Sequence, residues 1–221
     1  MTLAPSICGV ILAAGFSTRM GRDKALLPWP PVAEGTPVAN TFLGATIDLL
    51  QAYTDLVIVV AGKNEAAIEP VAYAHGAFIA VNRDPERGQF SSLQVGLQEV
   101  LNRGRDAALV ALIDHPPVLP ITVRNLLDVF LTPGSDVWAV VPEVRRAERL
   151  VHGHPIVVRR EMIEVFLRAP VDATARDVEH QCQQHIQYVP VEDARIATNI
   201  DTPEEYEALC RSDLISSEKQ F

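Results

Sequence analysis

Close to the N-terminus, an apolar strand pattern runs directly into a turn of small residues, in the sequence GVILAAGFSTRMGRDK of residues 9–24. Small residues after a buried first strand let the backbone approach a ligand closely. Successive backbone N–H groups, followed by Arg19 and Lys24, are suited to a polyphosphate. Ligands of open α/β sheets bind at the carboxyl ends of the strands, so this turn is expected to lie at the binding edge.

Two familiar nucleotide-binding patterns do not describe this turn. No Gly-Lys-Ser/Thr follows at the spacing of a P-loop, and the dinucleotide pattern G-x-G-x-x-G is absent from it. Among the 19 Lys and Arg residues only three are lysines, Lys24, Lys63 and Lys219, and one of them falls in the turn. That placement favours a phosphate site over a tight glycine turn with an incidental Arg and Lys.

Apolar runs of strand length alternate with amphipathic segments of helix length along the chain. Several runs are continuous in Val, Ile, Leu and Ala, as expected for strands covered on both faces. The alternation predicts a single Rossmann-like α/β domain, with a mostly parallel twisted sheet and helices on both faces. The expected strands are 7–12, 56–61, 77–81, 107–113, 137–141, 155–158 and 186–190. The expected helices are 39–51, 65–75, 91–102, 121–130, 160–167, 175–183 and one that opens at Thr202 and Pro203.

The domain is expected to span residues 1–211, and the polar residues 212–221 to form a frayed tail. Residues 33–36 and 132–135 are interpreted as loops, and the charged stretch 142–153 as an excursion from the sheet. The sequence contains no repeat of about 20–50 residues and no linker long enough to separate domains.

The composition excludes several classes of protein. Hydrophobic residues make up 48% and charged residues 21% of the 221 residues, as in globular proteins. The net charge is −9 and no basic stripe is present, so no nucleic-acid partner is expected. Three widely spaced cysteines form neither a zinc knuckle nor a disulfide framework. No apolar run reaches about 18 residues, so we expect a cytoplasmic protein without a membrane span.

A carboxylate, Asp114, directly follows the apolar run 107–113 and precedes His115 and two prolines. The carboxyl ends of parallel strands share one edge of a sheet, so Asp114 is expected beside the turn of residues 9–24. A hard oxygen ligand there suits Mg²⁺ that bridges phosphates. The alternatives are that Asp114 forms an N-cap or Asx-turn before the prolines, and that His115 is a loop histidine without a catalytic role.

The pattern L-A-A-G-x-S-x-R-M-G-x-x-K, from Leu12 to Lys24, resembles the signature of the sugar-phosphate-type nucleotidyltransferases. Within them, most of the chain resembles the molybdenum cofactor branch, the molybdopterin cytidylyl- and guanylyltransferases. The resemblance implies that the loop cradles a nucleoside triphosphate and that Arg19 and Lys24 meet its phosphates. The loop residues implied in nucleotide binding are Leu12, Ala13, Ala14, Gly15 and Ser17.

Two later segments carry the same resemblance. In RGQFSSLQVGL, residues 87–97, Ser92 matches a helix start that the family places against the nucleobase. The alternative is that the serines of this segment only cap the helix. Asp114 matches the family's Asp-x-Pro pattern, which implies a catalytic and metal-binding role. His115 departs from the pattern, because the branch usually has Gln or Met at that position.

The final third of the chain adds two more matches. Gly-His-Pro at residues 153–155 resembles a motif of the cytidylyl sub-branch, which implies that His154 lies on the acceptor side. The family also uses an acidic or amide residue just before the last helix as a second metal ligand. Asp201 and Asn199 are two residues apart and point the same way in an extended segment, so either could face the nucleotide. Asp201 is our choice, because a carboxylate is the better hard ligand, and Asn199 is the reserve. The alternative is that Asp201 only caps the helix that starts at Pro203.

The resemblance implies Mg²⁺-dependent nucleotidyl transfer, in which an acceptor phosphate attacks the α-phosphorus of a nucleoside triphosphate and pyrophosphate leaves. Ala14 stands where the guanylyl branch typically has a second Gly, and with the motif at residues 153–155 this favours CTP over GTP. The implied acceptor is molybdopterin, and the implied protein partner is a molybdoenzyme that receives the product. Two alternatives remain: a transferase of the same fold for a sugar or polyol phosphate, and a non-catalytic maturation protein that binds a cofactor.

Overall fold

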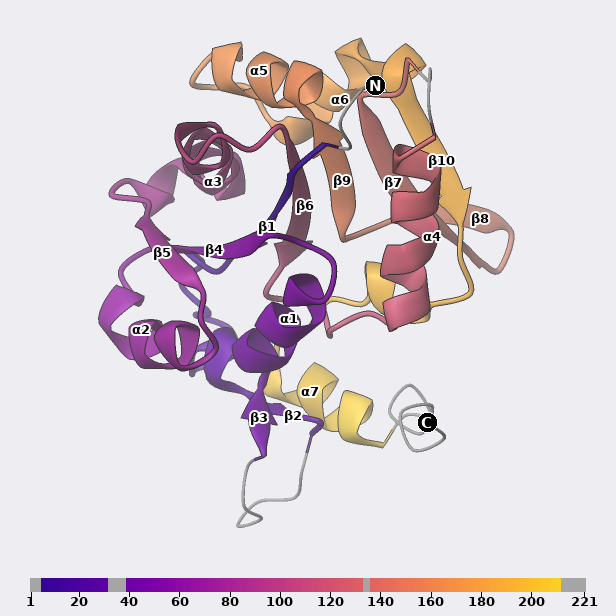
Figure 1. The fold of residues 1–221 in the computed structure, drawn as a ribbon. Helices are drawn as coiled ribbons and strands as arrows, with labels where there is room; N and C mark the ends of the chain where they lie inside the picture. The colour runs from indigo at the N-terminus through magenta and orange to yellow at the C-terminus, as the bar shows by residue number, and fades with distance from the viewer. Residues whose placement is uncertain (1–4, 32–38, 133–135, 212–221) are drawn as a thin grey trace.

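The computed structural model describes residues 5–31, 39–132 and 136–211. Within these residues, a central eight-stranded sheet has the order β10-β7-β9-β6-β1-β4-β5, with β8 paired to β7 (Figure 1). Its strands are β1 (Ile7–Leu12), β4 (Leu56–Ala61), β5 (Phe78–Val81), β6 (Ala107–Leu112), β7 (Ala139–Arg146), β8 (Arg149–His152), β9 (Ile156–Arg159) and β10 (Ile186–Pro190). A separate two-stranded sheet joins β2 (Pro28–Trp29) and β3 (Asn40–Thr41).

The sheet is mostly parallel, as predicted. Strand β1 pairs in parallel with β4 and β6, β4 pairs in parallel with β5, and β10 does so with β7. Strand β9 lies antiparallel between β6 and β7. The helices are α1 (Phe42–Gln51), α2 (Glu65–Ala74), α3 (Gln89–Asn102), α4 (Pro120–Phe130), α5 (Arg160–Arg168), α6 (Ala175–Gln181) and α7 (Pro203–Cys210).

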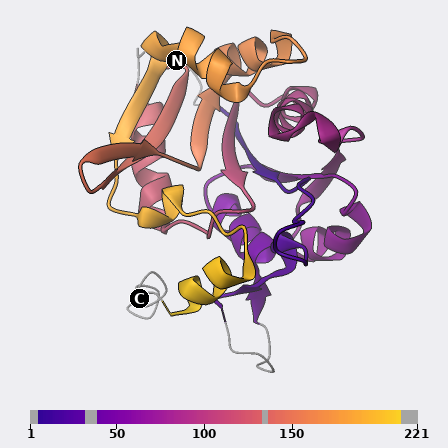
Figure 2. The same ribbon diagram turned by 180° about the vertical axis from the view of Figure 1, so that it is seen from behind.

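Helices cover both faces of the sheet and bury a separate core on each. Ile7 and Ile11 of β1 belong to the core under α1, α2 and α4, whereas Cys8, Val10 and Leu12 belong to the core under α3, α5 and α6. This alternation follows from the two-residue period of a strand. Figures 1 and 2 show the two helical layers from opposite sides. The predicted α/β architecture is therefore confirmed.

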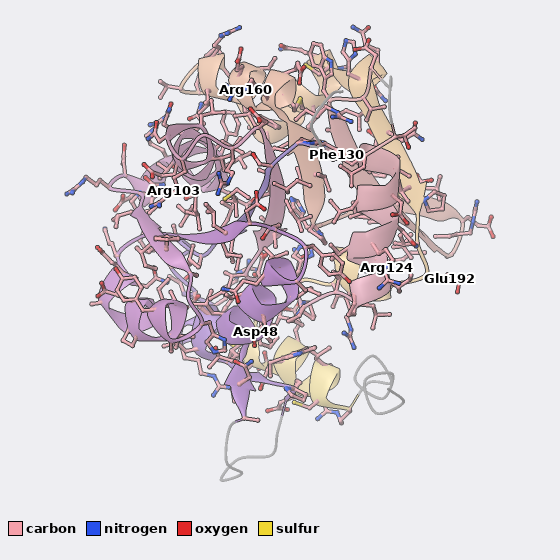
Figure 3. All side chains as sticks on the ribbon, viewed as in Figure 1. Asp48, Arg103, Arg124, Phe130, Arg160 and Glu192 are labelled. Carbon is pink, nitrogen blue, oxygen red and sulfur yellow. The ribbon has the colours of Figure 1, made fainter. Side chains whose placement is uncertain are left out.

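Burial separates the apolar and charged residues of the helices. Phe130 at the end of α4 is fully buried, whereas Arg124 of the same helix and Arg160 of α5 are exposed (Figure 3). Full burial of one such side chain contributes about 1.5–3 kcal/mol to stability. No helix in the described part of the chain is long and apolar enough to cross a membrane.

The interpretation of residues 142–153 as an excursion from the sheet is wrong. Strand β7 continues to Arg146, and β8 returns beside it in antiparallel pairing, with Val144 opposite Val151. The hairpin satisfies the backbone polar groups, while the charged side chains that suggested a loop remain exposed along it. Pairing of the two strands, and not the polar composition, therefore determines the structure of this stretch.

Several element bounds also differ from the prediction. The helix expected over 39–51 begins at Phe42, because Asn40 and Thr41 pair with β2 and Thr41 Oγ1 caps α1 by accepting from Gly44 N at 3.0 Å. The expected loop at 33–36, residues 133–135 of the expected loop at 132–135, and the expected tail at 212–221 lie outside the described residues.

Candidate active site

The turn after β1 is fixed on one side by a side chain that follows β4. Asn64 Nδ2 donates to the carbonyl oxygen of Ala13 at 2.9 Å and to Asp23 Oδ2 at 2.7 Å. Asp23 Oδ1 in turn accepts from Ala25 N at 2.9 Å, and Ala13 N donates to Val60 O at 2.9 Å. The two ends of the turn are thus held to the neighbouring strand connection, as a preorganised anion site requires.

The other side of the turn is open to a cleft of about 380 Å³. A β-carbon at Gly15 would meet no atom within 4 Å, so ligand atoms can approach the backbone there. Ser17 adopts a positive φ of 48°, and its Oγ accepts from Lys24 N at 3.2 Å. The cleft lies between this turn and the start of α3. Its walls include Gly15, Ser17, Lys24, Gln89, Ser92 and Asp114.

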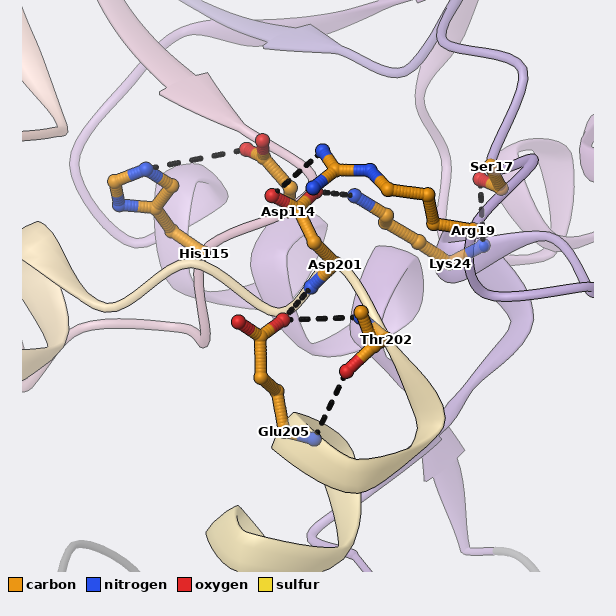
Figure 4. Close-up of polar contacts among 8 residues, drawn as sticks. All are labelled: Ser17, Arg19, Lys24, Asp114, His115, Asp201, Thr202 and Glu205. Carbon is orange, nitrogen blue, oxygen red and sulfur yellow. Dashed lines mark hydrogen bonds and ion pairs between the residues drawn. The ribbon is translucent and has the colours of Figure 1, made fainter.

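Asp201 brings the two predicted phosphate-binding cations together. Its Oδ1 accepts from Lys24 Nζ, and its Oδ2 lies 2.9 Å from Arg19 Nη2 (Figure 4). The Lys24 side chain is only 12% exposed and that of Asp201 19%, whereas Arg19 is 69% exposed. The hydrogen bond from Lys24 holds the pKa of Asp201 below its usual value, so this carboxylate is ionised near neutral pH.

Asp201 does not cap the last helix, so that alternative is wrong. The N-cap of α7 is Thr202, whose Oγ1 accepts from Glu205 N, while Glu205 Oε2 accepts from Thr202 N and Asp201 N. The capping box leaves both carboxylate oxygens of Asp201 free to face the loop (Figure 4). Asn199, the reserve ligand, is exposed and contacts neither Lys24 nor Arg19 through any hydrogen bond of the described residues.

Asp114 follows β6 at the same sheet edge. Its backbone carbonyl accepts from Ile200 N at 2.8 Å, which places the segment carrying Asp201 beside it. Asp114 Oδ1 is buried and has no hydrogen-bond partner among the described residues. The N-cap of α4 is Leu119, so the Asp114 side chain does not cap that helix. An orphaned buried carboxylate oxygen is costly unless a ligand or ion satisfies it.

The two carboxylates suit a divalent cation that keeps other ligands. In the described part of the chain, no three His, Cys, Asp or Glu side chains gather closely enough to enclose a metal. Mg²⁺ commonly binds through one or two carboxylates and completes its shell with water and substrate phosphates. The orphaned oxygen of Asp114 therefore fits Mg²⁺, and Asp201 is the second carboxylate at this edge.

His115 and His154 meet at one backbone carbonyl. His115 Nδ1 donates to Ile196 O at 3.0 Å, and His154 N donates to the same oxygen at 2.9 Å. A β-carbon at Gly153 would collide with that oxygen, which explains the glycine of the Gly-His-Pro motif. Burial lowers the pKa of both imidazoles, so they are neutral near pH 7.

The imidazole of His115 has a defined position beside the carboxylate of Asp114. With its proton on Nδ1, the neutral ring carries no proton on Nε2, which lies 3.9 Å from Asp114 Oδ1. The imidazole therefore borders the orphaned carboxylate oxygen without satisfying it. This arrangement keeps the lone pairs of Asp114 available to a ligand.

The start of α3 supplies Ser92 to the cleft, although the serines do not occupy the N-cap. That position belongs to Gly88, which adopts a φ of 90°. Ser91 Oγ and Ser92 Oγ instead accept from Asn82 Nδ2 at 2.8 and 3.0 Å. Asn82 thus positions Ser92 at the wall of the cleft.

The structure brings most of the predicted residues to one edge of the sheet. Of the predicted residues, Leu12, Ala14, Gly15, Ser17, Lys24, Ser92 and Asp114 line the cleft. Asp201 lies beside it through its ion pair with Lys24 and also pairs with Arg19, whereas Ala13 is buried. The His154 ring packs against His115, with ring centroids 5.7 Å apart. Sequence reasoning missed the supports Asn64, Asp23 and Asn82. Asn64 and Asn82 each follow a strand by a few residues, and polar side chains at that position are the signal that would have found them.

Cations and carboxylates beside a small-residue turn are suited to phosphate chemistry, and the fold and its family make this chain a nucleotidyltransferase. The chain belongs to the MobA-like NTP transferase domain family, whose model matches residues 9–186. The match extends from β1 to the first residue of β10 and includes Asp114.

Individual relatives carry different names. A protein of Paenarthrobacter nicotinovorans named nicotine blue oxidoreductase is 31% identical, over 91% of this chain and 95% of its own. A molybdenum cofactor guanylyltransferase of Xanthomonas euvesicatoria pv. vesicatoria is 27% identical to this chain. The match covers 95% of this chain and 97% of that protein.

A crystal structure of Rv0371c from Mycobacterium tuberculosis has a TM-score of 0.76 and 29% identity, over 96% of this chain and 100% of that one. A complex of the same mycobacterial protein with manganese has a TM-score of 0.69 and 27% identity. The match covers 94% of this chain and 99% of that one. These structures share the fold of the chain over nearly its whole length.

Proposed function

We propose that the protein is a Mg²⁺-dependent cytidylyltransferase that moves CMP from CTP to the phosphate of molybdopterin and releases pyrophosphate. The observation that carries this proposal is the juxtaposition of two cations with the orphaned carboxylate oxygen of Asp114 at one cleft. Such a set positions phosphates and neutralises charge, and nucleotidyl transfer requires little covalent chemistry from the protein.

The chain supplies a distinct contact for each part of the nucleotide. Lys24 would neutralise charge that develops on the reacting phosphoryl group, and Arg19 with the backbone amides of residues 14–17 would hold the outer phosphates. Ser92, which lines the cleft at the start of α3, would contact the nucleobase. Asp114 and Asp201 would hold Mg²⁺, which when bound supplies positive charge to the phosphoryl oxygens.

The ion pairs of Asp201 support its role as the second ligand. In the structure its carboxylate neutralises Lys24 and Arg19. A bound triphosphate would compete for both cations with several negative charges, and Asp201 would then be released from them. A carboxylate freed in this way beside Asp114 is available to a divalent ion. The manganese complex of the mycobacterial structural relative agrees with divalent metal binding in this fold.

The acceptor assignment rests on the relatives and on His154. One relative is named a molybdenum cofactor guanylyltransferase. His154 lines a groove that shares Leu12, Gly88 and Gln89 with the cleft, and there it would face the acceptor. The oxidoreductase name of another relative is not carried over, because the turn of residues 9–24 lacks the G-x-G-x-x-G pattern of dinucleotide enzymes. A purely binding protein would have no need of the carboxylate pair.

CTP is expected to bind more tightly than GTP in the presence of Mg²⁺. Ala14 in the turn and the Gly-His-Pro motif at 153–155 motivate this expectation. Isothermal titration calorimetry with each nucleotide measures the preference directly, and pyrophosphate release with and without molybdopterin tests turnover. Equal affinity for the two nucleotides, or a clear preference for GTP, would overturn the cytidylyl assignment but not the fold. Pyrophosphate release with a sugar phosphate instead of molybdopterin would change the acceptor.

Asp201→Asn is expected to raise the Mg²⁺ concentration required for half-maximal rate by about tenfold, which corresponds to about 1.4 kcal/mol of metal binding. The melting temperature should change little, because Thr202 and Glu205 cap α7 and the asparagine oxygen can still accept from Lys24. A Mg²⁺ titration of the initial rate checks the first point and thermal unfolding the second. Unchanged Mg²⁺ dependence here, together with a strong defect in Asn199→Ala, would transfer the role to Asn199.

A further inference from the structure

A second groove, of about 560 Å³, continues from the nucleotide cleft. Leu12, Gly88 and Gln89 line both spaces, so a molecule in the groove would lie next to a bound nucleotide. The groove runs between the start of α3 and the start of α6, over β6 and β9. His154, the residue expected on the acceptor side, is part of its wall.

The floor of this groove is apolar. It is formed by side chains of two adjacent strands and one helix, which are Val110, Leu112, Ile156, Phe90 and Leu93. Strand side chains that share one face of a sheet make a level surface. A level apolar floor favours a flat ring system, which loses contact with water over its whole face.

Glu179 projects from α6 into the groove, one turn after Ala175, which also lines it. The side chain is partly buried, and burial raises the pKa of its carboxyl group. Within the described ranges, Glu179 makes no hydrogen bond or ion pair of its side chain, although the charge of Arg176 acts on it. A partly desolvated carboxylate without donors is stabilised by a ligand that brings N–H groups to it.

The rim of the groove carries charges of both signs. Arg87 and Arg176 are exposed and line the groove, and so does Asp172. An apolar floor, a carboxylate on one wall and two guanidinium groups at the rim suit a flat heterocycle with N–H donors that also carries an anionic group.

We propose that this groove holds the heterocycle of the acceptor and that Glu179 selects a flat ring with two adjacent N–H donors on one edge. A carboxylate accepts two such parallel hydrogen bonds, as it does from a guanidinium group. A pterin presents this edge through its 2-amino group and the neighbouring ring N–H. The inference rests on the proposed function, because it assigns the acceptor side of the same reaction.

The first test measures binding of pterin itself, without nucleotide, by its fluorescence. Wild-type protein is expected to bind pterin more tightly than lumazine, which has a carbonyl in place of the 2-amino group and lacks the adjacent donor pair. Glu179→Gln is expected to weaken pterin binding by about 10- to 100-fold and to abolish the preference over lumazine. Glu161→Gln, an exposed glutamate on α5 outside the groove, should match the wild type.

The second test separates the groove from the nucleotide site. In Glu179→Gln the KM for molybdopterin should rise by a similar factor, while the Kd for CTP stays at the wild-type value. Equal binding of pterin and lumazine by the wild type, or full pterin binding by the folded Glu179→Gln variant, would overturn the inference. Selective pterin binding without pyrophosphate release from any nucleotide would uphold the groove and reject the proposed function.

Discussion

Replacing Asp114 with alanine is expected to lower the rate of pyrophosphate release by about 10²–10³-fold, the usual cost of one preorganised charge contact. The protein should remain folded, because the buried Oδ1 of Asp114 has no hydrogen-bond partner among the described residues. Removal of an unsatisfied buried polar atom relieves a desolvation cost rather than breaking an interaction. Initial rates with CTP and molybdopterin, together with thermal unfolding, measure both effects.

Asp106→Ala is the matched control for this variant. Asp106 precedes β6 and Asp114 follows it, so the two aspartates lie at opposite ends of the same strand. Asp106 pairs with Arg160 at 2.9 Å, and both side chains are about half exposed, so its loss should cost little stability and no activity. A near-normal rate for folded Asp114→Ala would remove Asp114 from the reaction.

Strands with continuous apolar sequence were predictable in position and length. β1 and β4 have the predicted bounds, since their Val, Ile and Leu residues can be buried in few other ways. β10 also has the predicted bounds, although Val189 is its only buried residue. β8 was missed because its four residues, Arg149–His152, lie in a charged stretch and none of them is buried; its backbone is stabilised by pairing with β7. β2 and β3 are two residues long, too short to leave a periodic pattern.

In the candidate site, too, features encoded by local sequence were predictable, and contacts between distant residues were not. The turn after β1 and Asp114 could be placed from the sequence because each directly follows a strand, and parallel strands fix where their ends meet. The contact between Lys24 and Asp201 joins residues 177 positions apart, so no local pattern encodes it. The support from Asn64 was likewise hidden, since its side chain bonds to a turn 41 residues earlier at Asp23.

Lys24→Ala is expected to lower kcat by about 10²–10³-fold, with a smaller change in the KM for CTP. The Lys24 side chain is only 12% exposed, so its charge is poorly screened by water and acts strongly on a phosphoryl group beside it. An interaction that strengthens as negative charge develops affects kcat more than ground-state binding. Steady-state kinetics of pyrophosphate release separates the two constants.

Arg19→Ala and Lys63→Ala are the variants whose rates should be compared with that of Lys24→Ala. Arg19 pairs with the same carboxylate but is 69% exposed, so water screens it and Arg19→Ala should cost less and mainly raise KM. Lys63 pairs with Glu86 at an exposed position, and Lys63→Ala should leave the rate near the wild-type value. If Lys24→Ala were no slower than Arg19→Ala, the buried charge of Lys24 would act only to hold Asp201. Both cations would then serve binding of the triphosphate, and neutralisation of the developing charge would fall to the metal carboxylates alone.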